Sequence, residues 1–230
     1  MSAFNGFTPE ALDYFFRIEL DNSRENYERL RPVYQRAVRE PLFALYDALT
    51  PLMRLIDPGI CHRRARCVPT AFADARIARY PMRTYTYLHY CAEMQSEENV
   101  PGFYFEFDAR GYNCGLRIYH YSAASMHALR EAAAENVEEF QRVLTPLEGT
   151  GLKFSGEPYK KPRHAGAPEL AALWLNAKTW RIERAVVPPD ELFFSPALTE
   201  ERIADDFSAL ADLYHFLRTL SMTTHARQFL

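Results

Sequence analysis

The sequence contains two stretches that are dense in basic residues and could together bind an anion. The residues of the first are Arg63, Arg64, Arg66, Arg76, Arg79 and Arg83. Those of the second, in a region rich in glycine and proline, are Lys153, Lys160, Lys161, Arg163 and His164. Arginine suits this role because its planar guanidinium can donate to two oxygens of a carboxylate or phosphate at once. If the two stretches converge, they predict an anion pocket; the alternative is a solvated basic surface whose charge nearby acids offset.

A second candidate surface comes from alternating residues that predict a β-hairpin, with strands over 103–108 and 116–121 and a turn at 108–111. The polar or amphipathic side chains of one face are Tyr104, Glu106, Asp108, Arg117, Tyr119 and Tyr121. The apolar side chains of the other face, which we expect to pack against helices, are Phe103, Phe105, Phe107, Leu116 and Ile118. On a sheet that helices cover on one side only, the polar face is either solvent-exposed surface or the floor of a binding cleft. On a plain surface, Glu106 and Arg117 would form an ordinary cross-strand ion pair.

Other kinds of site find no support in the residue patterns. The seven histidines lack the spacing of metal ligands, and no H-E-x-x-H motif occurs. The G-x-S-x-G, Walker and G-x-G-x-x-G motifs of nucleophilic and nucleotide-dependent enzymes are missing as well. We therefore predict neither a metal nor a cofactor. The four cysteines, which we expect to be reduced thiols, are Cys61, Cys67, Cys91 and Cys114.

Charge and hydropathy narrow the range of partners. A formal net charge of −3 and a pI of about 6.2 create no overall attraction to nucleic acid or anionic lipid, so we predict neither as a partner. The apolar runs are short and the first residues are neither basic nor strongly apolar, which predicts no membrane span, no signal peptide and a cytoplasmic location. Aromatic residues make up 14% of the chain, and some tyrosines should line a surface or pocket, because a buried phenol needs a hydrogen-bond partner.

Helical periodicity marks both ends of the chain and strand periodicity its middle. Thr8-Pro9 predicts the start of a helix over 9–20, which ends at Asp21-Asn22-Ser23. The helical stretch that follows runs to Ile56, and Pro32 and Pro41 predict either two helices or one kinked helix. Further helices are expected over 122–144, 168–178 and 199–221, and further strands over 84–91, 152–154, 180–187 and, more weakly, 62–68. Residues 1–230 thus predict a single α+β domain with N-terminal helices, a central antiparallel sheet and C-terminal helices packed on the sheet.

Six motifs, in this order, carry a resemblance to known proteins. They are Gly6-Phe7-Thr8-Pro9-Glu10-Ala11-Leu12, Asn22-Ser23-Arg24-Glu25-Asn26-Tyr27, Arg39-Glu40-Pro41, Pro101-Gly102-Phe103-Tyr104, Lys160-Lys161-Pro162-Arg163 and Leu192-Phe193-Phe194-Ser195-Pro196. Together they resemble a bacterial family of conserved hypothetical proteins, domain of unknown function 2461, in which the second motif takes the form N-N-R-E-W-F. The likeness covers nearly the whole chain, and it implies the same α+β fold but no activity.

One segment departs from this family. Relatives resemble R-x-x-R-D-x-R-F-x-x-D-K-x-P-Y between the long helix and the first firm strand, where this chain has residues 72–82. Asp74, Arg76 and Pro81 match the family's Asp, second Arg and Pro, whereas Ala73 replaces an arginine and a short deletion removes the Asp-Lys pair. The segment has become mostly cationic. If the family's site lies here, this chain has lost the activity or has altered its ligand.

We therefore expect a small anionic molecule to bind to arginines near Arg76 and to tyrosines of the sheet. The residues expected to bind it are Asp74, Arg76, Arg79, Tyr85, Tyr104, Arg117 and Tyr119. An enzyme would also need a general acid or base beside the arginines, and the candidates are Asp74, Glu106 and His89. A protein–protein interaction module is the other alternative, and a large exposed apolar patch would favour it.

Overall fold

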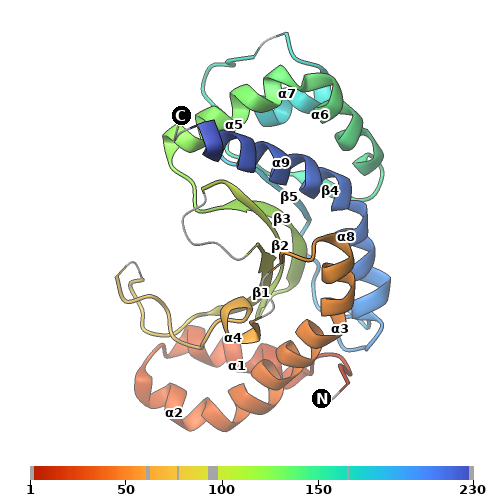
Figure 1. Ribbon diagram of the computed structural model, residues 1–230. Coiled ribbons are helices and arrows are strands. Elements are labelled where there is room, and N and C mark those ends of the chain that lie inside the picture. The colour runs from red at the N-terminus through yellow and green to blue at the C-terminus, as the bar shows by residue number, and fades with distance from the viewer. Residues whose placement is uncertain (1–2, 61–62, 77, 93–97, 165, 228–230) are drawn as a thin grey trace. The chain divides into compact units, whose positions relative to one another are not determined.

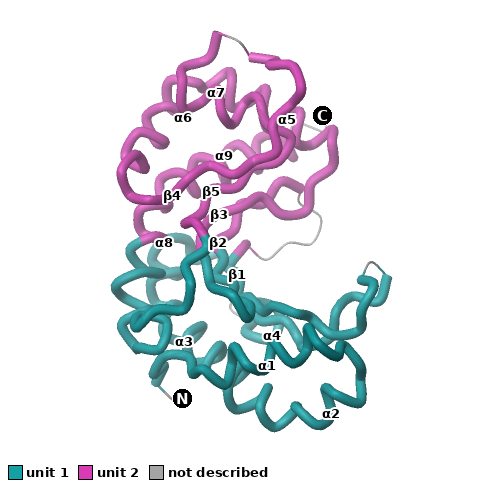
Figure 2. The backbone as a smooth tube through the Cα atoms, turned by 180° about the vertical axis from the view of Figure 1, so that it is seen from behind, with its two compact units in different colours: residues 1–90, 104–113, 186–205 teal, residues 91–103, 114–185, 206–230 magenta. Residues whose placement is uncertain are grey.

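The structure is a computed structural model that describes residues 3–60, 63–76, 78–92, 98–164 and 166–227 (Figure 1). Its helices and five-stranded antiparallel sheet confirm the predicted α+β class. The strands are β1 (Tyr85–Cys91), β2 (Val100–Asp108), β3 (Tyr112–Tyr119), β4 (Leu152–Phe154) and β5 (Arg181–Arg184), in the order β1-β2-β3-β5-β4. The chain divides into two compact units (Figure 2): unit 1 comprises 1–90, 104–113 and 186–205, and unit 2 comprises 91–103, 114–185 and 206–230. The expected single domain stays a prediction.

In unit 1 the first two helices begin where the sequence predicts. Helix α1 (Pro9–Leu20) begins after Thr8, which takes the extended conformation of an N-cap although its side chain makes no capping hydrogen bond. Helix α2 (Arg24–Val33) follows the predicted break. Ser23 Oγ caps this helix by accepting a 3.1 Å hydrogen bond from the backbone N–H of Asn26.

The prolines of the long helical stretch change the helix type without interrupting it. Pro32 lies inside α2, and Pro41 lies at the start of α3 (Glu40–Ile56). Between them the segment η1 (Tyr34–Arg39) is π-helical. Proline removes a backbone donor and its ring clashes with the preceding turn, and a locally wider turn accommodates such an irregularity. The stretch is therefore continuous from α2 to α3 rather than divided into two separate helices.

The predicted apolar face of the hairpin is buried. In unit 1, Phe105 and Phe107 are 0% and 2% exposed; Phe105 stacks on Phe7 with ring centroids 5.9 Å apart, and Phe107 meets Phe15 of α1 edge-on at 5.4 Å. The other members of this face, which lie in unit 2 and are also buried, are Phe103, Leu116 and Ile118. A period-two apolar pattern thus correctly identified which side chains face the core.

Two expectations about the sheet region are wrong. Tyr104 was expected on an exposed face or on the floor of a cleft, but it is fully buried, as is every residue of β2 from Val100 to Phe105. The strand lies between β1 and β3, and the large apolar ring of a tyrosine is readily buried there. The weaker strand expected over 62–68 is instead a short helix, α4 (Arg64–Cys67), consistent with the high helix propensity of Arg and Ala; His62 lies outside the described residues.

In unit 2, helices pack on the sheet as predicted, but the helix expected over 122–144 is divided. A capping box between Ser122 and Ser125 starts α5 (Ala123–Glu135), and α6 (Val137–Leu144) follows it. At the break, the Asn136 amide donates to the Ala132 carbonyl oxygen at 2.8 Å and so competes with the helical backbone. The short η2 (Thr145–Leu147) and α7 (Glu169–Leu175) come next.

The C-terminal helices are also segmented. The expected helix over 199–221 consists of the π-helical η3 (Thr199–Ala204), α8 (Asp205–Ala209) and α9 (Ala211–Arg227). The Phe103 ring of β2 lies 5.1 Å from that of Phe207 in α8 and 5.0 Å from that of Tyr214 in α9. These ring contacts place α8 and α9 against the sheet within unit 2. In the described part of the chain, no helix is both long and apolar enough to cross a membrane.

Candidate functional site

A pocket of about 310 Å³ in unit 1 gathers three of the residues expected to bind a ligand. It lies in the segment between α4 and β1, and Asn22 from the break between α1 and α2 also lines it. The polar and aromatic side chains that line it include Asn22, Asp74, Arg79, Tyr80, Arg83 and Tyr85. Tyr80 and Tyr85 are 54% and 42% exposed, so their rings are accessible to a ligand.

Asn22 holds the segment in place through a pair of hydrogen bonds to one peptide group. Its amide donates to the Met82 carbonyl oxygen at 3.0 Å, and its Oδ1 accepts from the Met82 N–H at 2.9 Å. Met82 also forms an isolated β-bridge with Phe72, which closes residues 72–82 into a loop. The backbone bonds from Ala73 to Pro81 and from Arg83 to Ala71, both 2.9 Å, support the same closure. These bonds close the backbone of the loop that carries Asp74 and Arg79, and Arg83 follows directly after it.

Asp74 and Arg76 form a closed pair within this loop. Asp74 Oδ1 accepts from Arg76 Nε at 3.0 Å and Oδ2 accepts from Nη2 at 2.7 Å, and the Arg76 backbone N–H also donates to Oδ1. The hydrogen bonds from the Arg76 side chain and backbone lower the pKa of Asp74 to about 2. Arg76 is largely exposed and does not line the pocket. The Arg76 guanidinium was expected to face the pocket without a partner. Instead it binds the carboxylate of Asp74, two residues away on the same turn.

Arg79 and Arg83 supply the positive charge of the pocket. Within the described residues, neither forms an ion pair with a carboxylate. Arg79 lies over the Tyr80 ring, with Cζ 5.3 Å from the ring centroid. Arg83 Nε donates to the Phe72 carbonyl oxygen at 3.1 Å. Because both Asp74 oxygens already bond Arg76, the pocket carries two guanidinium groups that form no ion pair with a described acidic side chain, and Asp74 acts on Arg83 only at longer range.

The other expected residues lie elsewhere. Tyr104 is fully buried in β2. Arg117 and Tyr119 belong to unit 2, where Arg117 Nε donates to the Tyr119 hydroxyl at 2.8 Å and its guanidinium lies over the Tyr119 ring. Of the acid–base candidates, Glu106 and His89 are not among the residues that line the pocket. The structure thus brings Asp74, Arg79 and Tyr85 together and leaves the remaining four expected residues outside the pocket.

Sequence reasoning missed the parts played by Asn22 and Tyr80, and it counted Arg83 only as one member of a basic stretch. The Asn22–Met82 contact joins residues 60 positions apart, and no local pattern signals it. Tyr80 could have been selected, because an exposed aromatic residue next to Arg79 is a common partner for a guanidinium.

The described residues contain no group of three or more His, Cys, Asp or Glu side chains arranged to hold a metal ion.

Comparison with protein families found that the family described as conserved hypothetical protein (DUF2461) matches residues 10–216. Comparison with curated proteins found no match.

Proposed function

The chain belongs to the DUF2461 family of conserved hypothetical proteins, a family name that implies no activity, and we propose its function from the pocket in unit 1. We propose that this pocket binds a small anionic molecule. One observation carries this proposal. Arg79 and Arg83 line one pocket without an ion-pair partner among the described residues, while the pocket's Asp74 is held by Arg76. Two guanidinium groups in this state favour a ligand with carboxylate or phosphate oxygens.

The size and lining of the pocket agree with a small ligand. Its volume of about 310 Å³ is at the lower end of the range for small-molecule sites. The exposed rings of Tyr80 and Tyr85 offer aromatic contact and two hydroxyl groups beside the arginines. A compact organic anion fits this combination better than a nucleic acid or a membrane surface.

The departure from the family pattern falls inside this pocket. Ala73, which stands where the family pattern has an arginine, is among the residues that line it. An alanine there removes a positive charge and opens space on the loop side of the pocket. We propose on this ground that the chain has altered its ligand rather than lost the site.

Asp74 is a poor candidate for acid–base catalysis. A carboxylate whose pKa is about 2 is a weak base, and both of its oxygens already accept hydrogen bonds from Arg76. With His89 and Glu106 not lining the pocket, a binding function has more support than an enzymatic one.

Removing either pocket arginine is expected to abolish anion binding. In a thermal-shift screen with phosphate, sulfate and small carboxylates, the wild-type protein should gain melting temperature with at least one anion, because ligands that bind the folded state stabilise it. Arg79→Ala and Arg83→Ala should lose that gain and remain folded by circular dichroism. Arg54→Ala is the matched control, since Arg54 is an exposed arginine of α3 in the same unit, outside the pocket.

Two results would contradict the proposal. The first is a screen in which no anion raises the melting temperature at constant ionic strength. The second is a gain that Arg79→Ala and Arg83→Ala retain in full, which would show that the anion binds elsewhere.

We also propose that the protein works in the cytoplasm, where cysteines remain reduced. Cys67, Cys91 and Cys114 form no disulfide with another described residue, and Cys61 lies outside the described residues. Thiol titration of the denatured, unreduced protein is expected to return all four thiols of the sequence. A count of two or fewer would indicate disulfides and argue against this location.

A further inference from the structure

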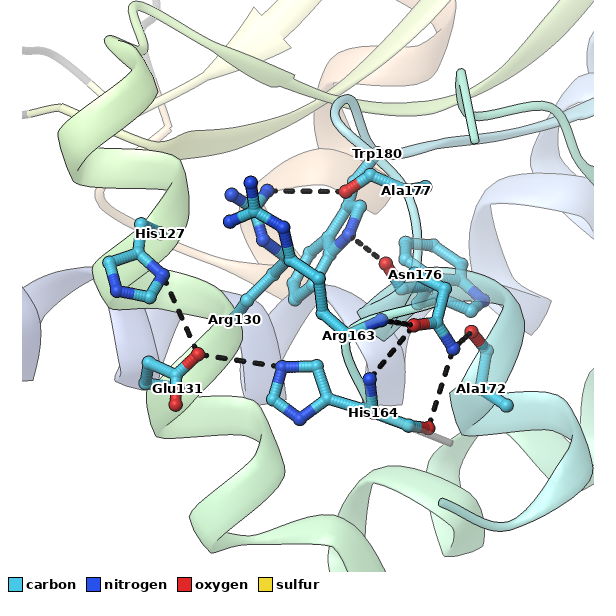
Figure 3. A network of polar contacts seen from close by, with 10 residues as sticks. His127, Arg130, Glu131, Arg163, His164, Ala172, Asn176, Ala177 and Trp180 are labelled. Carbon is cyan, nitrogen blue, oxygen red and sulfur yellow. Dashed lines mark hydrogen bonds and ion pairs between the residues drawn. The ribbon is translucent and has the colours of Figure 1, made fainter. Parts of the chain in front are cut away.

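Arg130 of α5, in unit 2, is a buried cation without an acidic partner. Its side chain is almost entirely buried, with the residue 2% exposed. Nη1 donates to the carbonyl oxygen of Ala177 at 3.2 Å (Figure 3) and, more weakly, to that of Lys178 at 3.5 Å. Nε and Nη2 make no hydrogen bond with any residue that the structure describes, and Arg130 forms no ion pair with them. Burial lowers the pKa of Arg130, as expected for a charge that is only partly compensated.

A second arginine lies beside the same aromatic ring. The guanidinium carbon of Arg130 is 5.1 Å from the centroid of the Tyr159 ring, and that of Arg163 is 4.0 Å from it. The backbone positions Arg163, because its N–H and that of His164 both donate to Asn176 Oδ1, at 2.6 and 3.0 Å (Figure 3). Arg163 is exposed, whereas Arg130 is buried. Two positive charges therefore lie close together, one at the surface and one beneath it.

The neighbouring acidic side chains contact groups other than Arg130. Glu131 Oε1 lies 3.5 Å from His127 Nδ1 and 3.4 Å from His164 Nε2 (Figure 3). Glu157 pairs with Lys178. Because burying a charge without a counter-charge is costly, this arrangement favours an anion that the chain itself does not supply.

We propose that Arg130, Tyr159 and Arg163 form a second anion site, distinct from the pocket of unit 1, for a small molecule that carries a carboxylate or phosphate group. Nε and Nη2 form one edge of the guanidinium, and their parallel N–H bonds match two oxygens of such a group. Arg163 adds a second positive charge at the surface.

The two tryptophans of the chain provide a local probe for this site. Trp174 and Trp180 are the only ones in the sequence, and both flank the Ala177–Lys178 turn that Arg130 contacts. The Trp180 indole N–H donates to the Trp174 carbonyl oxygen at 2.6 Å. Intrinsic fluorescence therefore reports on unit 2, whereas the unit 1 pocket contains tyrosines only.

The test is a fluorescence titration with inorganic phosphate and, separately, with succinate, at constant ionic strength set with sodium chloride. At least one anion should change the tryptophan fluorescence saturably. A response to phosphate indicates a phosphate site, and a response to succinate indicates a carboxylate site. Arg163→Ala should weaken the affinity by about tenfold or more, because a charge-assisted bond is lost. Lys161→Ala, an exposed change two residues away, should stay within about twofold of wild type.

Arg130→Gln should abolish the saturable change while circular dichroism shows a folded protein; if this variant does not fold, Arg163→Ala alone decides. Arg79→Ala and Arg83→Ala should leave the fluorescence response to the anion unchanged, because these arginines belong to the unit 1 pocket. The two proposed anion sites can therefore be tested independently of each other. The proposal is overturned if neither anion gives a saturable change, or if the change persists in Arg163→Ala at wild-type affinity.

Discussion

Replacing Phe105 by alanine is expected to lower the free energy of unfolding by about 3–5 kcal/mol. Its ring is fully buried, stacks on Phe7 and lies 6.0 Å from the ring of Tyr112. Alanine removes this apolar surface and leaves a cavity that the surrounding rings fill only in part. Urea denaturation followed by far-ultraviolet circular dichroism measures the loss, because both tryptophans lie in the other unit.

Phe16→Ala provides the matched control. Phe16 belongs to α1 in the same unit but is 53% exposed, so its replacement should change the free energy of unfolding by less than about 1 kcal/mol. A loss below about 1 kcal/mol for Phe105→Ala would mean that the site collapses around the smaller side chain, or that Phe105 is not in the core.

Replacing Asp206 by alanine is expected to cost a similar amount, about 3–5 kcal/mol. Asp206, only 4% exposed, accepts hydrogen bonds from Arg184 Nε at 2.8 Å and from Nη2 at 2.5 Å. It also accepts one from the buried Cys114 thiol at 3.1 Å. Its loss leaves the Arg184 charge without this partner in a site where Arg184 is only 23% exposed. Tryptophan fluorescence during urea denaturation is suitable here, because these residues and both tryptophans belong to unit 2.

A double variant distinguishes the loss of the Arg184–Asp206 ion pair from the cost of leaving the Arg184 charge without Asp206. Arg184→Met with Asp206→Leu removes both charges, and it should recover much of the stability that Asp206→Ala loses. Asp212→Ala, at an exposed position of α9, should have a small effect. If the double variant is no more stable than Asp206→Ala, the polar contacts themselves, rather than an uncompensated charge, account for the loss.

The fold was predictable wherever a periodic pattern extended over several residues. The alternating phenylalanines of β2 identified the strand and its buried face, and Thr8-Pro9 identified the start of α1. Single residues decided the errors. The Asn136 amide divides a helix whose apolar spacing is regular, and Tyr104 is buried although its hydroxyl suggests a polar surface. A pattern averaged over a window cannot show which hydrogen bond one such side chain makes.

The candidate site was less predictable, because its geometry depends on contacts that residue types do not reveal. Composition identified the arginine-rich segment, but the closure of Asp74 on Arg76 depends on the local turn. The same segment held in another conformation would leave Arg76 open to a ligand. The pairing of Arg130 with backbone carbonyls was also invisible, since an arginine at a helical position normally indicates an exposed face.

The pair of hydrogen bonds between Asn22 and Met82 gives the two sides of the unit 1 pocket unequal freedom to change. Met82 is anchored on both its N–H and its carbonyl, so Arg83 and Tyr85, which follow it, keep their places whatever the length of the loop before it. Asp74 and Arg79 lie within that loop and move with every insertion or deletion. If the pocket binds an anion as proposed, changes in loop length alone would alter its specificity, because Arg83 would keep its place while Asp74 and Arg79 would shift.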